Sequence, residues 1–122
     1  MTPTVRSPAR TIGILTAAMG IAGVAQPARG GRLAAGRHPP PPAGVVRLLA
    51  TRYAFQGIAE MARPTRTVLL AACVTDGLHA ASMVAAAVTR PAYRRAALCS
   101  GCIATGSALA TAFAASKAGG HV

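Results

Sequence analysis

The sequence predicts an all-α protein built as a bundle of four antiparallel transmembrane helices. Cutting the 122-residue chain at its charges leaves four mostly apolar segments, each close to the roughly 20 residues that cross a hydrocarbon core. Apolar residues make up 52% of the chain and aromatic residues 3%, and there is no Trp. Helices with such small side chains pack closely in lipid, whereas a soluble core needs larger ones. Short proline-containing linkers favour antiparallel neighbours.

The first predicted helix covers residues 11–28, which carry no charge. Gly13 with Ala17, and Thr16 with Gly20, form small-residue faces suited to close helix packing. Residues 1–10 before it are predicted to be a short basic tail. Because the basic tail, the apolar run and the small residues 23–25 also fit a signal peptide, the sequence leaves open whether residues 1–25 are retained or cleaved.

The other predicted helices cover residues 43–62, 67–89 and 96–116, and a C-terminal tail covers 117–122. The first connection, 27–44, is the longest, and we expect a loop there. Its glycines make it flexible, and the prolines at 39–42 favour polyproline II. The two later connections each place a proline where a helix should stop.

The chain carries 13 basic residues against two acids, and its net charge is +11. Most arginines flank apolar runs, as they do beside transmembrane helices, and stacking aromatic residues are scarce. This distribution predicts contact with anionic lipid headgroups and no nucleic-acid partner. The expected headgroup contacts are Arg29, Arg32, Arg37, Arg90, Arg94 and Arg95. The first and third connections carry six basic residues, and the two tails and the second connection carry five. This small excess leans toward both termini outside and leaves the orientation open.

Charged residues inside the second and third helices predict an ion pair between them. Arg52 lies about 12.5 residues before the middle of the connecting turn and Asp76 about 11.5 residues after it, so an antiparallel hairpin places them within about 2 Å in depth. An unpaired charge there costs roughly 2.5 to 3.5 kcal/mol on insertion scales. The predicted intramembrane polar seam comprises Arg52, Gln56, Glu60, Asp76 and His79.

Two roles are open for this seam. In the structural interpretation, the seam fixes the register of two alanine-rich helices. In the alternative, Asp76 and His79 belong to a channel or transporter subunit that handles protons or a small solute, since intramembrane ionisable groups often mark such paths.

Cys99 and Cys102 form a CxxC pair inside the fourth helix and are the only candidate catalytic residues. Four-helix membrane thiol oxidoreductases use such pairs, but they generally need a second pair, and the one remaining cysteine is Cys73. The structural alternative places both cysteines on a packing face with Gly106 and Ala110. No four-ligand metal set or phosphate-binding loop is present in the sequence, so we expect no metal and no cofactor.

Three stretches resemble a family of small bacterial four-helix integral membrane proteins, grouped as a domain of unknown function: GILTAAMGIAGVAQPARGGRLAAG, VRLLATRYAFQGIAEMARPTR and LAACVTDGLHAASMV. The family pattern has an Arg-Glu pair in the second helix and two acids in the third. Here Tyr53 follows Arg52, Asp76 is the one acid of the third helix, and His79 lies near the place of the other. The resemblance implies location and fold, without an activity.

Taken alone, the sequence therefore predicts a multi-pass protein of the cell membrane, in the inner membrane of a bacterium, whose activity is undetermined. The favoured class is a structural or interaction protein that acts through helix packing, as a homo-oligomer or beside a larger membrane partner, rather than an enzyme.

Overall fold

The computed structural model describes residues 6–118, and within this range the chain is all-helical. Residues 1–5 and 119–122, which belong to the two predicted tails, lie outside the described residues. The elements are α1 (Arg6–Ala25), α2 (Pro27–Ala35), α3 (Ala43–Ala62), α4 (Arg66–Thr89), the 3-10 turn η1 (Pro91–Tyr93) and α5 (Arg94–Ala118). The predicted all-α class is confirmed.

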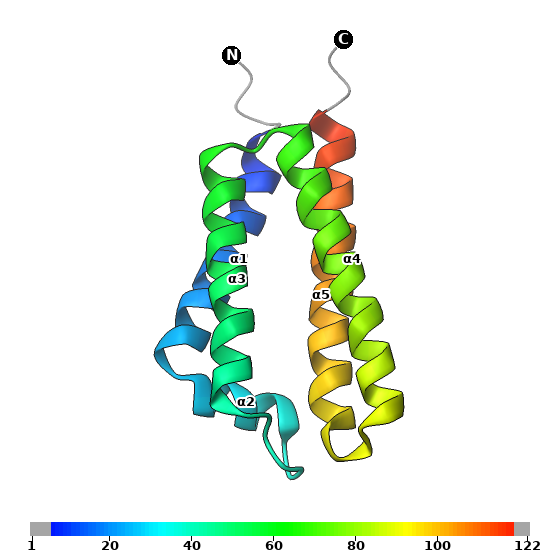
Figure 1. Ribbon diagram of the computed structural model, residues 1–122. Helices are drawn as coiled ribbons and strands as arrows, with labels where there is room; N and C mark the ends of the chain where they lie inside the picture. The colour runs from blue at the N-terminus through cyan, green and yellow to red at the C-terminus, as the bar shows by residue number, and fades with distance from the viewer. Residues whose placement is uncertain (1–5, 119–122) are drawn as a thin grey trace.

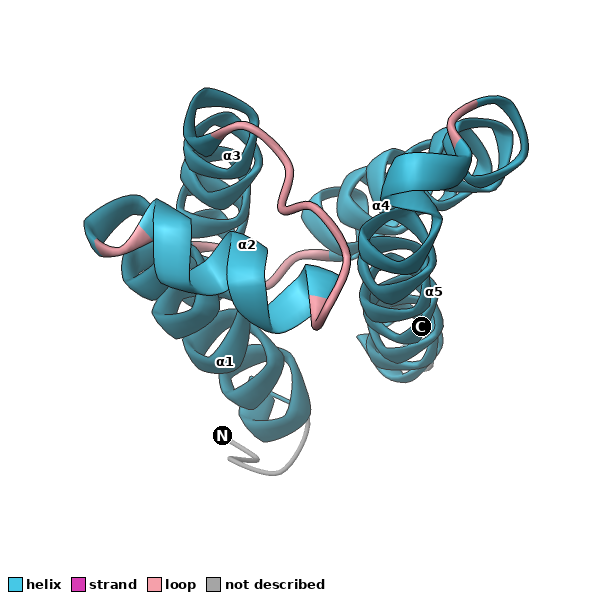
Figure 2. Cartoon of the chain, turned by 90° about the horizontal axis from the view of Figure 1, so that it is seen from below, coloured by secondary structure: helices cyan, strands magenta, loops and turns pink. Residues whose placement is uncertain are grey.

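The long helices form two antiparallel pairs, α1 with α3 and α4 with α5 (Figure 1). Helices α3 and α4 follow one another along the chain but belong to different pairs. The short helix α2 lies across one end of the molecule and contacts α1, α3 and α5 (Figure 2). Helix α1 begins and α5 ends at the opposite end, where the α3–α4 connection also lies (Figure 1).

Small residues let α1 and α3 approach until their backbones touch. Gly13 and Gly20 of α1 are buried, as are Thr16 and Ala17. A Cβ atom added to Gly13 would lie 2.9 Å from the Gly57 carbonyl oxygen of α3. One added to Gly20 or Gly57 would overlap the backbone of the opposite helix. The small-residue faces predicted for the first helix are therefore its packing surface.

The predicted end of the first helix and the predicted loop after it are wrong. Because proline lacks an amide hydrogen and clashes with the preceding turn, α1 ends at Ala25 and Pro27 opens the new helix α2. Helix α2 ends at Gly36, whose φ of +62° lies in the left-handed region and whose N–H donates to the Arg32 carbonyl at 2.9 Å. The loop that precedes α3 is therefore short.

Among residues 6–118, three helical segments are long and apolar enough to cross a membrane: Pro8–Ala25, Arg66–Thr89 and Pro91–Ala118. Helix α3, the predicted second span, is not among them, because Arg47, Arg52 and Glu60 interrupt its apolar residues. The observed helices also run past the predicted boundaries, since α1 begins inside the predicted basic tail and α5 extends beyond residue 116.

Replacing Gly20 or Gly57 with alanine is expected to lower the free energy of unfolding by roughly 1 to 3 kcal/mol, because the added Cβ overlaps the opposite backbone. Denaturant titration in detergent micelles measures this loss. Gly77→Ala and Gly106→Ala are matched controls, since nothing lies within 4 Å of a Cβ at either position. Alanine there should leave stability unchanged or raise it by up to about 1 kcal/mol. Equal effects at all four glycines would contradict the close α1–α3 approach.

Candidate functional site

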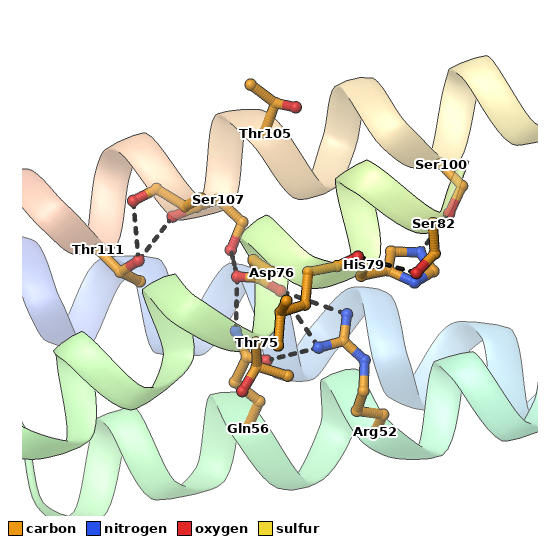
Figure 3. Close-up of polar contacts among 12 residues, drawn as sticks. Arg52, Gln56, Thr75, Asp76, His79, Ser82, Ser100, Thr105, Ser107 and Thr111 are labelled. Atoms are coloured by element: carbon orange, nitrogen blue, oxygen red, sulfur yellow. Dashed lines mark hydrogen bonds and ion pairs between the residues drawn. The ribbon is translucent and has the colours of Figure 1, made fainter. Parts of the chain in front are cut away.

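The carboxylate of Asp76 connects three helices. Its side chain is fully buried in the middle of α4. Arg52 Nη2 of α3 lies 3.3 Å from Asp76 Oδ1, and Gln56 Nε2 donates to Oδ2 at 2.9 Å. From α5, the Ser107 hydroxyl donates to the same Oδ2 at 2.6 Å (Figure 3). The ion pair that the helix register predicts is therefore present, within a larger polar network.

Ser107 is a member of this network that the sequence analysis missed. Ser107 lies 16 residues after Pro91, and Asp76 lies 15 residues before Pro91. A hairpin of α4 and α5 that turns at Pro91 therefore brings the two side chains to the same depth. The count that pairs Arg52 with Asp76 would have found this partner. A hydroxyl carries no charge, however, and so does not stand out in an apolar segment.

Arg52 is held from both sides of its guanidinium group. Nη1 donates to Gln56 Oε1 and to Asp76 Oδ1, each at 3.3 Å. The guanidinium carbon lies 4.4 Å from the centre of the Tyr53 ring, a distance typical of a cation–π contact. Arg52 keeps 26% of its side chain exposed, while Asp76 keeps none. The neighbouring Tyr53 thus orients the positive partner of the pair.

Glu60 continues the network along α3. Gln56 Nε2 donates to Glu60 Oε1 at 3.2 Å, so Gln56 bridges the two acids of the chain. Glu60 is fully buried, although its position near the end of α3 predicts that its side chain lies at the membrane–water boundary. Its other oxygen, Oε2, has no hydrogen-bond partner among the described residues.

His79 makes a separate link between α4 and α5. Its Nε2 lies 2.9 Å from the Ser100 hydroxyl oxygen (Figure 3). Its ring also meets the Tyr53 ring edge-on, with 6.4 Å between the ring centres. The contacts of His79 thus run to Ser100 of α5 and Tyr53 of α3, which are not among the five residues of the predicted seam. The proton-handling interpretation stays a prediction.

The two cysteines of the CxxC pair are free thiols near the start of α5. Cys99 is half-buried and Cys102 exposed, and both line a cavity of about 490 Å³ together with His38, Arg94 and Arg95. Of the predicted packing face, Cys99 and Ala110 are half-buried, whereas Cys102 and Gly106 are exposed and do not pack against another helix of this chain. The thiol-redox interpretation also stays a prediction.

All six arginines of the predicted headgroup set are exposed, and their two segments lie at the α2 end of the molecule (Figure 1). Arg94 Nε also donates to the Ala87 carbonyl at 3.1 Å, which closes the end of α4. Within residues 6–118, no three His, Cys, Asp or Glu side chains are grouped so that they could hold a metal ion.

No family model matches the chain, and no match to it is found among curated proteins or solved structures. The resemblance to a family of small four-helix membrane proteins therefore stays a prediction.

Ser107→Ala should lower the free energy of unfolding by about 0.5 to 2 kcal/mol, because it removes a hydrogen bond to a buried carboxylate. The measurement is a denaturant titration in micelles. Ser82→Ala is the matched control, since the exposed Ser82 hydroxyl donates only within its own helix, to Leu78, at 2.9 Å. A loss at Ser82 as large as that at Ser107 would contradict an interhelical role for Ser107.

Proposed function

We propose that the protein is a multi-pass protein of the cell membrane in which α3 crosses the bilayer together with α1, α4 and α5. The observation that carries this proposal is the distribution of side chains around α3. Leu48 and Phe55 keep 73% and 71% of their area exposed, whereas Glu60 keeps none. Two of the three charges that make α3 too polar by composition, Arg52 and Glu60, thus turn toward the other helices, and an apolar face is left for lipid.

The remaining helices present the same kind of exposed surface. Leu78 and Val88 of α4 are 67% and 71% exposed, and Leu109 of α5 is 68% exposed. Soluble monomers rarely expose apolar surface of this extent on every long helix. Helix α3 has 20 residues and spans about 30 Å, which matches the thickness of a hydrocarbon core. The third charged residue of α3, Arg47, is exposed near the helix start, where it can reach headgroups.

Within this architecture we assign the polar network a structural role. Asp76 already accepts hydrogen bonds from Arg52, Gln56 and Ser107, and its charge is balanced by Arg52. These three partners lie on α3 and α5, so the contacts of Asp76 join three helices. The favoured function is therefore that of a structural or interaction protein, whose apolar faces contact lipid, a second copy or a larger membrane partner.

Cysteine labelling tests whether α3 crosses the membrane. In a variant with Cys73, Cys99 and Cys102 replaced by alanine, single cysteines are placed at four exposed positions: Pro39, Ala62, Ala92 and Ser116. We expect an impermeant maleimide added to intact cells to label Pro39→Cys and Ala92→Cys together, or Ala62→Cys and Ser116→Cys together. None of these changes removes a basic residue, so the charge bias that sets orientation is kept.

Labelling of Pro39→Cys and Ala62→Cys from the same side would show that α3 does not cross and would contradict the proposal. Release of the protein from membranes by alkaline carbonate would contradict membrane integration altogether.

A further inference from the structure

A cavity of about 770 Å³ lies between the α1–α3 pair and the α4–α5 pair, at the end of the molecule where α2 lies. All five α-helices contribute to its wall. The large side chains of the wall are mostly apolar and include Met19, Leu33, Val46, Leu49, Met83 and Ile103. Its volume is in the range of roughly 300 to 1,000 Å³ that is typical of small-molecule sites.

The charge on this cavity has one sign. Arg29 of α2 and Arg90 at the end of α4 line it, and both are exposed. The chain has two acids, Glu60 and Asp76, and neither lines the cavity. The other four arginines of the predicted headgroup set are absent from the lining. Two guanidinium groups at the α2 end of an apolar chamber thus favour a ligand with an anionic head.

Tyr53 of α3 and Ser100 of α5 also line the cavity. Tyr53 is 6% exposed, and the Arg52 guanidinium stacks on its ring. The Ser100 hydroxyl is bonded to His79. The chamber therefore reaches residues that contact Arg52 and His79. Tyr53 lies ten residues into α3, about 15 Å along the helix axis, so the chamber is deep enough for an extended apolar chain.

We propose that this cavity binds one anionic phospholipid, with its phosphate at Arg29 and Arg90 and an acyl chain along the apolar wall toward Tyr53. The inference rests on the proposed membrane location, because it draws its ligand from the bilayer. Of the six arginines expected to meet headgroups in general, the inference assigns Arg29 and Arg90 to one bound lipid. Inorganic phosphate or another small anion would leave the apolar wall of this cavity without a ligand contact.

The test uses the full chain, purified in detergent, freed of lipid and titrated with phosphatidylglycerol, while native mass spectrometry counts bound lipid. We expect one tight phosphatidylglycerol per protein and at least tenfold weaker binding of phosphatidylcholine with the same acyl chains. The double variant Arg29→Gln/Arg90→Gln should bind phosphatidylglycerol roughly thirtyfold more weakly, if each arginine contributes as a basic residue does at an anionic membrane surface. Arg32→Gln/Arg37→Gln removes the same charge outside the cavity and should change binding by less than about threefold.

A second pair of variants tests the apolar chamber without changing charge. Ala86 lines the cavity and is half-buried, whereas its neighbour Ala85 is exposed and does not line it. Ala86→Leu fills the chamber and should weaken phosphatidylglycerol binding at least tenfold, while Ala85→Leu should not. Circular dichroism checks that all variants keep their helix content. If the arginine variants fail to fold, the two leucine variants still decide the question.

Three results would overturn the inference. The two double arginine variants could lose phosphatidylglycerol affinity equally, phosphatidylcholine could bind as tightly as phosphatidylglycerol, or oleate could bind more tightly than phosphatidylglycerol. The first indicates unspecific attraction of the anionic headgroup to basic residues, the second indicates recognition of the acyl chains alone, and the third indicates a free fatty acid. Failure of the proposed function is seen separately, as release of the protein by carbonate. A membrane-integral protein without selective lipid binding would overturn this inference alone.

Discussion

The burial of one carboxylate, Asp76, is the constraint on which the rest of the structure depends. A charge inside an apolar helix is unfavourable unless partners from other helices satisfy it. Arg52 and Gln56 supply these partners from α3, and Ser107 supplies one from α5. Because the partners are on different helices, satisfying Asp76 fixes the depth of α3 and α5 relative to α4.

The network also explains why two tightly packed helix pairs leave a cavity between them. Glycines bring the α1 and α3 backbones into contact, whereas the long side chains of Arg52 and Gln56 bridge α3 to α4. A contact made by long polar side chains keeps the pairs farther apart than one made by glycine and alanine. Between the network and α2, neither Arg52 nor Gln56 lines the cavity. There the space between the helix pairs forms the chamber, which extends along α3 as far as Tyr53.

The helical class and the Arg52–Asp76 contact could be predicted because both follow from helix length and from charge in an apolar segment. Helix α2 could not, since its adjacent glycines disfavour helix locally and its contacts with α1, α3 and α5 are tertiary. Ser107 carries no charge to mark it. The burial of Glu60 depends on Gln56, which lies one turn earlier on α3 and donates a hydrogen bond to Glu60 Oε1.

A double-mutant cycle on the ion pair tests this account most directly. Asp76→Asn keeps an oxygen for Gln56 and Ser107 and removes the charge, while Arg52→Gln removes the opposite charge. Unfolding free energies in micelles should show that each change alone destabilises the protein, and that the double variant loses less than the sum by about 0.5 to 3 kcal/mol. Additive losses would contradict the claim that this pair holds the two halves of the molecule in register.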